Sequence, residues 1–268
     1  MDEKVVLITG GSSGIGKSTG IFLTSKGMKV YGTTRNLRKH KDFSHFELLE
    51  MDVTDDSTID RTINTIIENE GRIDVLLNNA GVGITGPIEE TPIDEVVNAY
   101  NTNLNGPLRM IQAVLPFMRK QQGGLIINIT SIAGYMGLPF RGIYSATKGS
   151  LELITEALRM ETRPFNIHIT NLAPGDFATN IATGRYHTPV FEHSPYKDYH
   201  RTLTSINDDV ADAQDPILVA KKIFAIMKMK SPKGHYLVGT FMQKLSVFLK
   251  RLLPSTIFER LLLNHYNL

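Results

Sequence analysis

The sequence predicts an α/β fold: a single Rossmann-type, doubly wound parallel sheet with helices on both faces. Short, continuously apolar runs recur along the chain, as is typical of strands that are buried on both faces of a parallel sheet. Stretches with helical spacing separate most of these runs, which indicates right-handed crossovers between parallel strands. A glycine-rich turn directly follows the first run and leads into the first helical stretch.

Each strand is expected to be short and to end near a polar or glycine-rich turn. The expected strands span residues 4–8, 28–33, 46–50, 73–77, 125–129, 167–171 and 235–238. The expected helices span residues 15–26, 55–69, 93–120, 144–162 and 216–229. Gly27 ends the first helix, because glycine is favoured just past a helix C-terminus.

The pattern changes after Pro174. Residues 176–215 mix proline, tyrosine, histidine and charge without a clear period, so we expect a substrate-binding loop region there. Helical spacing returns in the C-terminal tail, residues 241–268, where apolar side chains repeat on both sides of Pro254. No internal repeat or low-complexity linker divides the chain, so residues 1–268 are expected to form one domain.

The composition is that of a globular protein with a substantial core, since 41% of the 268 residues are hydrophobic and 21% are charged. A formal net charge of +2 gives no reason to expect a nucleic-acid partner. The chain has no cysteine, which excludes disulfides and thiolate chemistry. The histidines of the 176–215 region fit no common zinc spacing, so no metal is expected.

The N-terminus enters the first strand directly and shows no export signal, and no apolar run approaches the ~20 residues that span a bilayer. We therefore expect a cytoplasmic protein. The tail carries basic residues beside its apolar positions: Lys244, Lys250, Arg251 and Arg260. We expect the tail to pack over the substrate entrance or against a partner subunit; peripheral contact with a membrane is an alternative that we do not favour.

The turn after the first strand reads Thr-Gly-Gly-Ser-Ser-Gly-Ile-Gly over residues 9–16. Glycines let the backbone turn sharply and approach a ligand, and the following helix presents free N–H groups to a pyrophosphate. The spacing of Gly10, Gly14 and Gly16 differs from the Gly-x-Gly-x-x-Gly of the standard dinucleotide fingerprint. The alternative is a plain tight turn, but the position after the first strand favours phosphate binding.

The end of the second strand indicates which dinucleotide binds. An NAD site has a carboxylate there for the ribose 2′-hydroxyl, whereas this chain has Arg35 and no acid before Asp42. Arg35 suits a 2′-phosphate, because a guanidinium binds phosphate through two parallel hydrogen bonds. Further basic residues add positive potential: Arg38, Lys39 and Lys41. We therefore expect NADP(H) to be preferred over NAD(H); the alternative is that Arg35 belongs to a solvated surface loop.

Tyr144 and Lys148 lie four residues apart, on one face of a predicted helix. A phenol with a pKa of ~10 is a poor acid–base catalyst at neutral pH. A lysine ammonium ~5 Å away favours the phenolate by roughly 3 kcal/mol, which lowers the phenol pKa by about two. The pair is therefore a candidate proton donor and acceptor.

Two further motifs lie at the carboxyl edge of the predicted sheet, where open α/β folds bind ligands. Ser131 follows the strand at residues 125–129, and the sequence Asn-Ala-Gly at residues 79–81 follows the strand at residues 73–77. Taken with the glycine turn and the tyrosine–lysine pair, these motifs closely resemble the short-chain dehydrogenase/reductase family. The resemblance runs over residues 5 to about 179, and the separate motifs arrive in the family's order and spacing.

The resemblance implies roles for four catalytic residues. Tyr144 would be the general acid–base that protonates a carbonyl or deprotonates an alcohol. Lys148 would lower the pKa of that phenol and hold the nicotinamide ribose, and Ser131 would hydrogen-bond the reacting oxygen. Asn103 resembles the helix asparagine that holds a water for proton relay. The asparagines two positions before and after it are alternatives, and so is an asparagine that merely satisfies a helix carbonyl.

The resemblance also implies contacts to each part of the cofactor. Ser13 and Ile15 resemble the contacts of the phosphate turn, and Asp52 and Val53 resemble the adenine contacts. The segment from Pro174 to Thr179 resembles the one that holds the nicotinamide carboxamide. The expected cofactor-binding residues are Gly10, Ser12, Ser13, Gly14, Ile15, Gly16, Arg35, Asp52, Val53, Asn79, Ala80, Gly81, Tyr144, Lys148, Pro174, Gly175 and Thr179.

These features predict an oxidoreductase that transfers a hydride between NADP(H) and a carbonyl or secondary alcohol. A lipophilic substrate (steroid-, retinoid- or keto-acyl-like) is expected because the pocket candidates are mostly apolar or aromatic: Tyr135, Met136, Leu138, Phe140, Phe177, Tyr186 and Phe191. The alternative is a catalytically silent dinucleotide-sensing or scaffold protein on the same fold. The resemblance also implies a homodimer or homotetramer, with the long helices before and after Ser131 forming the contact.

Overall fold

The computed structural model describes residues 3–177, 184–211 and 214–268. Within these ranges, seven parallel strands form one sheet in the order β3-β2-β1-β4-β6-β7-β9. The strands are β1 (Val5–Ile8), β2 (Lys29–Thr34), β3 (Glu47–Glu50), β4 (Val75–Asn78), β6 (Gly124–Ile129), β7 (Ile167–Pro174) and β9 (His235–Val238). The order reverses between β1 and β4, which is where open α/β sheets bind their ligands. The predicted Rossmann-type sheet is confirmed.

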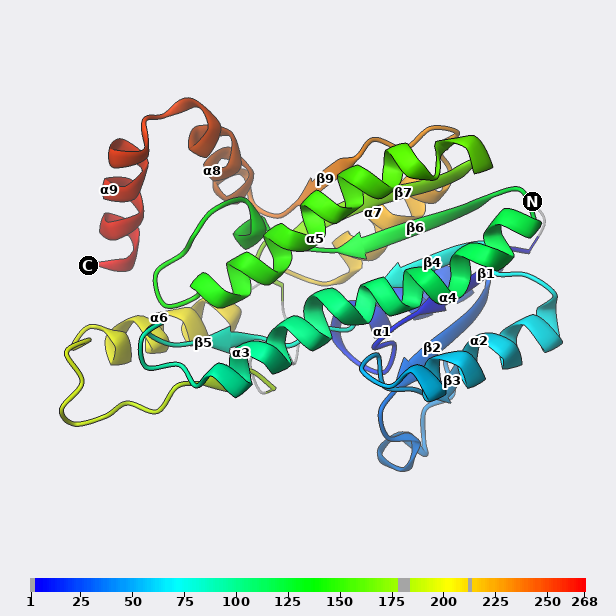
Figure 1. Ribbon diagram of the computed structural model, residues 1–268, viewed down its shortest axis with the longest axis horizontal. Coiled ribbons are helices and arrows are strands. Elements are labelled where there is room, and N and C mark those ends of the chain that lie inside the picture. The colour runs from blue at the N-terminus through cyan, green and yellow to red at the C-terminus, as the bar shows by residue number, and fades with distance from the viewer. Residues whose placement is uncertain (1–2, 178–183, 212–213) are drawn as a thin grey trace.

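Helices cover both faces of the sheet (Figure 1). Alternate residues of β1 point to opposite faces: Val5 and Leu7 pack with one layer of helices, and Val6 and Ile8 pack with the other. Because the strand is apolar on both faces, all four side chains are buried, and each such burial contributes about 1.5–3 kcal/mol. The layers are formed by α2 (Asp56–Glu70), α4 (Gly106–Lys120) and α5 (Gly142–Glu161) on one face, and by α1 (Gly14–Thr24) and α7 (Ile217–Met227) on the other.

The prediction of one continuous α-helix over residues 93–120 is wrong. The segment consists of α3 (Ile93–Tyr100), a π-helical turn η2 (Asn101–Asn105) and α4. Pro107 has no N–H to donate to the carbonyl four residues earlier, so the regular α-helical ladder is interrupted at this point. The wider turn places Asn103 on the inner side, where it is fully buried.

The prediction that residues 176–215 form an irregular loop region is also wrong in part. One helix in this region was missed because Tyr199 and Thr202 occupy two of its inward positions, so that no simple apolar period is visible. The Tyr199 hydroxyl donates to the carbonyl oxygens of Thr85 and Thr188, at 3.1 Å and 3.0 Å. The elements involved are α6 (Tyr199–Ala211), β8 (Tyr186–His187) and its parallel partner β5 (Ile84–Thr85).

The C-terminal tail forms α8 (Phe241–Leu252) and α9 (Ser255–Tyr266). Figure 1 shows both helices, with α6, on the side of the molecule towards which the strands point. Thr240 and Gln243 form a capping box at the start of α8, and the Gln243 amide also donates to Asp176 Oδ2 at 2.8 Å. The tail is therefore tied to the segment that follows β7. No helix in the described ranges is long and apolar enough to cross a membrane.

Three short 3₁₀ helices lie in connections between the described elements: η1 (Leu37–His40) between β2 and β3, η3 (Ile132–Tyr135) between β6 and α5, and η4 (Arg163–Phe165) between α5 and β7.

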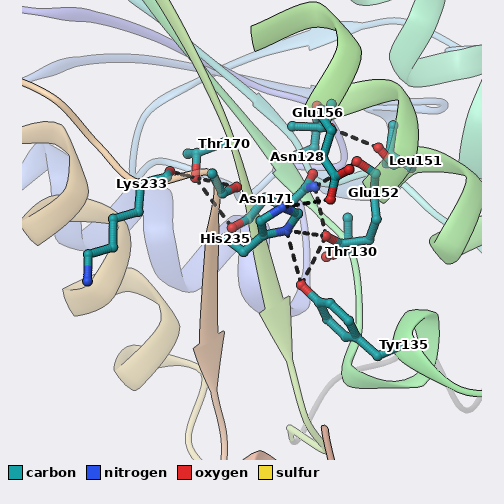
Figure 2. Close-up of polar contacts among 12 residues, drawn as sticks. Asn128, Thr130, Tyr135, Leu151, Glu152, Glu156, Thr170, Asn171, Lys233 and His235 are labelled. Atoms are coloured by element: carbon teal, nitrogen blue, oxygen red, sulfur yellow. Dashed lines mark hydrogen bonds and ion pairs between the residues drawn. The ribbon is translucent and has the colours of Figure 1, made fainter. Parts of the chain in front are cut away.

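A buried polar cluster joins α5 to the sheet (Figure 2). Its centre is Glu152, whose side chain is 7% exposed. The carboxylate accepts hydrogen bonds from Tyr135 Oη at 2.9 Å, from Asn171 Nδ2 at 2.8 Å and from the Thr130 hydroxyl. It also pairs with His235 Nδ1, 2.6 Å away. A buried carboxylate is costly unless its lone pairs are satisfied, so the cluster fixes α5 against β7 and β9.

His235 is the titratable partner in this cluster. The hydrogen bond to Glu152 raises the pKa of His235, and the charges of Glu152 and Glu156 add to that, although burial opposes it. A histidine whose pKa is raised on folding adds stability that is fully present below its unfolded pKa of about 6.5. That stability is lost as the pH rises through the folded pKa.

We therefore expect His235→Gln to lower the free energy of unfolding more at about pH 5.5 than at about pH 8.5. Urea unfolding of both proteins at the two pH values measures the difference. His168 is the matched control, because burial lowers its pKa, and its replacement should give the opposite pH trend. An equal loss of stability at both pH values for His235→Gln would contradict the ion pair.

Candidate active site

The glycine turn connects β1 to α1 where the strand order reverses. Gly10 and Gly14 have φ angles of 66° and 51°, a region that favours glycine. A Cβ at Gly16 would lie 2.3 Å from the Gly10 carbonyl oxygen, so α1 can start this close to the turn only without a side chain there. Ser13 makes no side-chain capping hydrogen bond within the described residues, which leaves the first N–H groups of α1 available to an anion.

Asn79 holds this turn against the end of β4. Its Nδ2 donates to the carbonyl oxygens of Thr9 and Gly10, at 2.9 Å and 3.1 Å. In return, Thr9 Oγ1 accepts from the backbone N–H groups of Asn79 and Ala80, both at 2.9 Å. These four bonds fix the ends of the two central strands relative to each other.

A cleft of about 790 Å³ lies at the carboxyl edge of the sheet. Its volume and its glycine cradle suit a dinucleotide. Gly16 lies behind the turn rather than in the wall, and Thr179 lies outside the described residues. The other expected cofactor-binding residues line the cleft: Gly10, Ser12, Ser13, Gly14, Ile15, Arg35, Asp52, Val53, Asn79, Ala80, Gly81, Tyr144, Lys148, Pro174 and Gly175.

Arg35 follows β2 directly, is exposed and lines the cleft. Lys39 and His40, from η1, line the same part of the wall. Asp52 lies beside them, where its Oδ1 accepts from the Thr54 N–H and hydroxyl, both at 2.8 Å. This end of the cleft therefore offers basic side chains to an anionic group.

In the described ranges, no group of three or more His, Asp or Glu residues is placed to hold a metal ion.

Tyr144 faces the cleft from the start of α5 and is 8% exposed. Burial raises the pKa of Tyr144, whereas the charge of Arg141, a hydrogen bond with Ser131 and the charge of Arg185 lower it. The Cζ of Arg141 lies 5.6 Å from the Tyr144 ring centroid. The hydroxyl is therefore shielded from water but adjacent to a second hydroxyl and to positive charge.

Lys148 lies one turn further along α5 and is 4% exposed. Its Nζ donates to the Ile129 carbonyl oxygen at 3.0 Å and lies 6.0 Å from the Tyr144 ring centroid. Burial lowers the pKa of Lys148 to about 8, and the charge of Glu152 partly opposes this. Arg141 and Arg185 lower the Tyr144 pKa, and neither was among the predicted site residues.

Ser131 and Asn103 come from different elements, and Ser131 lines the cleft whereas Asn103 does not. Ser131 precedes η3, and its Oγ accepts from the Ala133 N–H at 3.1 Å. Asn103 accepts from the Val82 N–H at 2.8 Å and donates to the Val82 carbonyl at 2.9 Å. Its Nδ2 also contacts Thr147 Oγ1 at 3.2 Å. The Asn103 amide thus joins the segment after β4 to α5. It therefore does more than accept the alternative role of satisfying a carbonyl of its own helix.

Most of the expected apolar pocket residues lie elsewhere. Phe177 lines the cleft, and the other six candidates do not. Tyr135 points to Glu152 and His235 instead (Figure 2). The Phe140 ring packs 5.3 Å from that of Tyr199. Of the remaining four, Leu138 and Tyr186 pack against the apolar cluster that contains Tyr144, and Tyr186 lines a small pocket that shares wall residues with the cleft. Met136 packs in another hydrophobic cluster, and Phe191 is 51% exposed.

Charged side chains line the cleft beside Tyr144 in their place: Arg141, Asp176 and Arg185. Arg141 stands before the first residue of α5, outside the predicted helix at residues 144–162, so helical spacing gave no signal for it. Arg185 lies in the 176–215 region, where no period indicates which side chains face inward. Its role is visible only once the fold brings that segment to the cleft.

Comparison with known protein families gives one match over most of the chain. The family described as short chain dehydrogenase matches residues 4–189. The 3-ketodihydrosphingosine reductase of Bacteroides thetaiotaomicron is 38% identical over 261 residues, which cover 97% of this chain and 96% of that protein. Human 17-beta-hydroxysteroid dehydrogenase type 1 is 31% identical over 256 residues, covering 88% of this chain and 77% of the relative.

Solved structures give the same picture. A short-chain dehydrogenase from Streptomyces avermitilis superposes with a TM-score of 0.83 at 29% identity, covering 100% of this chain and 97% of the other. ElxO with NADP bound has a TM-score of 0.73 at 29% identity, with coverages of 88% and 96%. A Burkholderia phymatum enzyme in complex with NAD shares the fold, with a TM-score of 0.80 at 24% identity and coverages of 92% and 92%.

Proposed function

Because the chain belongs to the short-chain dehydrogenase/reductase family, we propose that it transfers a hydride between NADP(H) and a lipophilic carbonyl or secondary alcohol. Family membership makes it an NAD(P)-dependent oxidoreductase. One observation carries the finer proposal: the buried hydroxyl of Tyr144 lies beside Ser131 in the same cleft that the phosphate turn lines.

In this proposal Tyr144 moves the proton. Its hydroxyl donates to the carbonyl oxygen during reduction and takes a proton from the alcohol during oxidation. The Ser131 hydroxyl donates to the same oxygen and stabilises the charge that develops there. When bound, the nicotinamide supplies the hydride to the carbonyl carbon or accepts it from the alcohol carbon.

Lys148 and Asn103 have supporting roles in this chemistry. The Lys148 ammonium, fixed by the Ile129 carbonyl, lies next to the backbone of Gly81, where it would hold the nicotinamide ribose. A Lys148 pKa of about 8 leaves that group able to exchange its proton near neutral pH. Asn103 holds the Val82 backbone and Thr147 in place, so the wall beside Tyr144 keeps its shape.

The choice of NADP(H) rests on Arg35. Its position directly after β2, in the wall of the cleft, is where a dinucleotide fold meets the adenosine ribose. Lys39 adds a second cation there, and the described acid in this part of the wall, Asp52, is engaged by Thr54. Arg35 and Lys39 would therefore bind a 2′-phosphate, whereas a 2′-hydroxyl carries no charge for them to neutralise.

A lipophilic substrate is supported by the surroundings of Tyr144. Its ring packs in an apolar cluster with Ile84, Ala99 and Ala133, and Val82 lies against the same cluster. The names of two similar proteins, a 3-ketodihydrosphingosine reductase and a 17-beta-hydroxysteroid dehydrogenase, point to lipid and steroid substrates for those enzymes. We extend the lipophilic class, not the individual compounds, to this chain.

The chain is also proposed to act as a homo-oligomer. The outer face of α5 exposes Leu153 and Met160, which are 68% and 72% exposed. Apolar side chains on the long helix that presents Tyr144 suit a contact with a second copy of the chain. The helix α5 is one of the two long helices, before and after Ser131, that were expected to form the contact.

Tyr144→Phe removes the proton donor without changing the shape of the cleft. We expect kcat to fall by about 10²–10⁴-fold, because that is the usual contribution of a positioned general acid–base. Binding of NADPH, followed by its fluorescence, should be largely kept. Tyr196→Phe is the matched control, since the Tyr196 hydroxyl donates to Glu89 on the surface, and it should retain activity. Unchanged turnover in Tyr144→Phe would remove the mechanism and favour the catalytically silent alternative.

Arg35→Ala tests the cofactor preference. We expect the affinity for NADPH to fall roughly 10- to 100-fold, the usual value of a charge-assisted hydrogen bond to phosphate, with little change for NADH. Titration of both cofactors by nucleotide fluorescence gives the two affinities. Arg38→Ala, on η1, is the control for a general loss of positive potential. If Arg35→Ala weakened the binding of NADPH and NADH equally, the result would favour the alternative that Arg35 belongs to a solvated surface loop.

A further inference from the structure

Two arginines stand beside Tyr144 in the cleft. Arg141 immediately precedes α5, and its guanidinium carbon lies 5.6 Å from the Tyr144 ring centroid. Arg185 immediately precedes β8 and packs against the bare backbone of Gly83, where a Cβ would lie 2.8 Å from Arg185 Cγ. Both side chains line the cleft. They reach it from segments that are far apart in the sequence, so a specific fold is needed to bring them together.

The positive charge of this pair is only partly balanced by the protein. Burial and the charge of Arg141 lower the pKa of Arg185, so the two guanidinium groups are close enough to repel each other. Asp176 is the carboxylate that interacts with both Arg185 and Tyr144. Its Oδ2 already accepts a hydrogen bond from Gln243 of α8, 2.8 Å away. Among the described residues, Asp176 is thus the carboxylate shared by the two cations and the tail.

Arg185 also keeps an unused donor. Its Nη1 is buried and has no hydrogen-bond partner among the described residues. A buried N–H on a cation is costly to leave unsatisfied, so such a group in a binding cleft indicates that a ligand completes it. Guanidinium groups match the planar oxygens of carboxylates and phosphates, with two parallel hydrogen bonds to each.

We propose that Arg141 and Arg185 form a subsite for an anionic group of the substrate, a carboxylate or a phosphate, close to the carbonyl that Tyr144 protonates. This inference rests on the proposed function, because it names the substrate class of the same site. The apolar residues in the wall of the cleft, Val82, Ile84 and Phe177, receive the hydrocarbon part. The substrate is then an amphiphile: an oxo compound or its alcohol, with a negative group near the reacting carbon and an apolar chain beyond it.

The phosphates of the cofactor are the other source of negative charge in this cleft. In the proposed function, those phosphates bind to the phosphate turn, which precedes α1, and to Arg35, which follows β2. Arg141 and Arg185 instead accompany Tyr144, Gly83 and Asp176 in the wall. The experiment below therefore measures cofactor affinity and substrate affinity separately.

Two matched pairs of ligands test the subsite. The first is a medium-chain γ-oxo acid and its methyl ester, and the second is a long-chain hydroxyketone and its phosphate monoester. Each pair differs in one negative group, and the two pairs separate carboxylate from phosphate. Calorimetric titration into the protein saturated with NADP⁺ measures binding without turnover, and NADPH oxidation in a separate assay measures turnover.

We expect the anionic member of at least one pair to bind more tightly than its neutral partner. Arg141→Met and Arg185→Met should each reduce that preference roughly 10- to 100-fold, the usual range for a charge-assisted hydrogen bond. Arg185→Lys should retain part of the preference, because it keeps the charge but loses the planar donor pair. Arg61→Met, an exposed arginine of α2, is the matched control and should leave the preference unchanged.

Each outcome bears on one of the two proposals. Equal binding of both members in both pairs would overturn the subsite, whatever the turnover. A loss of NADPH affinity in Arg185→Met, with the ligand preference intact, would assign this guanidinium to the cofactor and also overturn it. Tighter binding of a matched ketone that carries an ammonium group would do the same. Reduction of the neutral ketones by the wild-type protein would meanwhile support the proposed function, so failure of the subsite leaves that function standing.

Discussion

The hydroxyl of Tyr144 is buried among positive charges, and this constraint links the fold to the proposed chemistry. Burial alone raises the phenol pKa, which keeps the hydroxyl protonated but makes it a weaker acid, whereas Arg141, the hydrogen bond with Ser131 and Arg185 lower the pKa again. Because the opposing effects come from different elements, the balance exists only in the folded chain. The same positive charge that adjusts Tyr144 also attracts a negative substrate, so acid–base catalysis and specificity share one source.

The rest of the structure holds this arrangement in place. The Glu152 cluster fixes α5 on the sheet one turn beyond Lys148, and the Asn103 amide holds the opposite wall. Thr9 and Asn79 lock the two central strands, so that the phosphate turn and the wall beside Tyr144 keep a constant relation. These groups are satisfied by protein partners, and they form a rigid frame around the cleft.

The sequence predicted what depends on local pattern. The apolar runs gave the strands of the parallel sheet, and the glycine turn, Arg35 and Tyr144 were placed at its carboxyl edge because they follow strands or open helices. It failed where one local pattern outweighed or concealed another: the apolar period of residues 93–120 outweighed the helix-breaking Pro107, and Tyr199 conceals the period of α6. It also failed where the cause is not local. Arg185 reaches the cleft through tertiary contacts that no sequence spacing encodes. Tertiary contacts also place most of the aromatic pocket candidates away from the cleft wall.

A crystal structure with NADP⁺ bound would show where the Tyr144 hydroxyl points. We expect this hydroxyl and that of Ser131 to face the same side of the nicotinamide ring, across a gap that one carbonyl group fills. A Tyr144 hydroxyl turned away from the ring, or a ring bound on the far side of Lys148, would contradict this expectation. The chain would then have no positioned proton for the hydride transfer that its family performs.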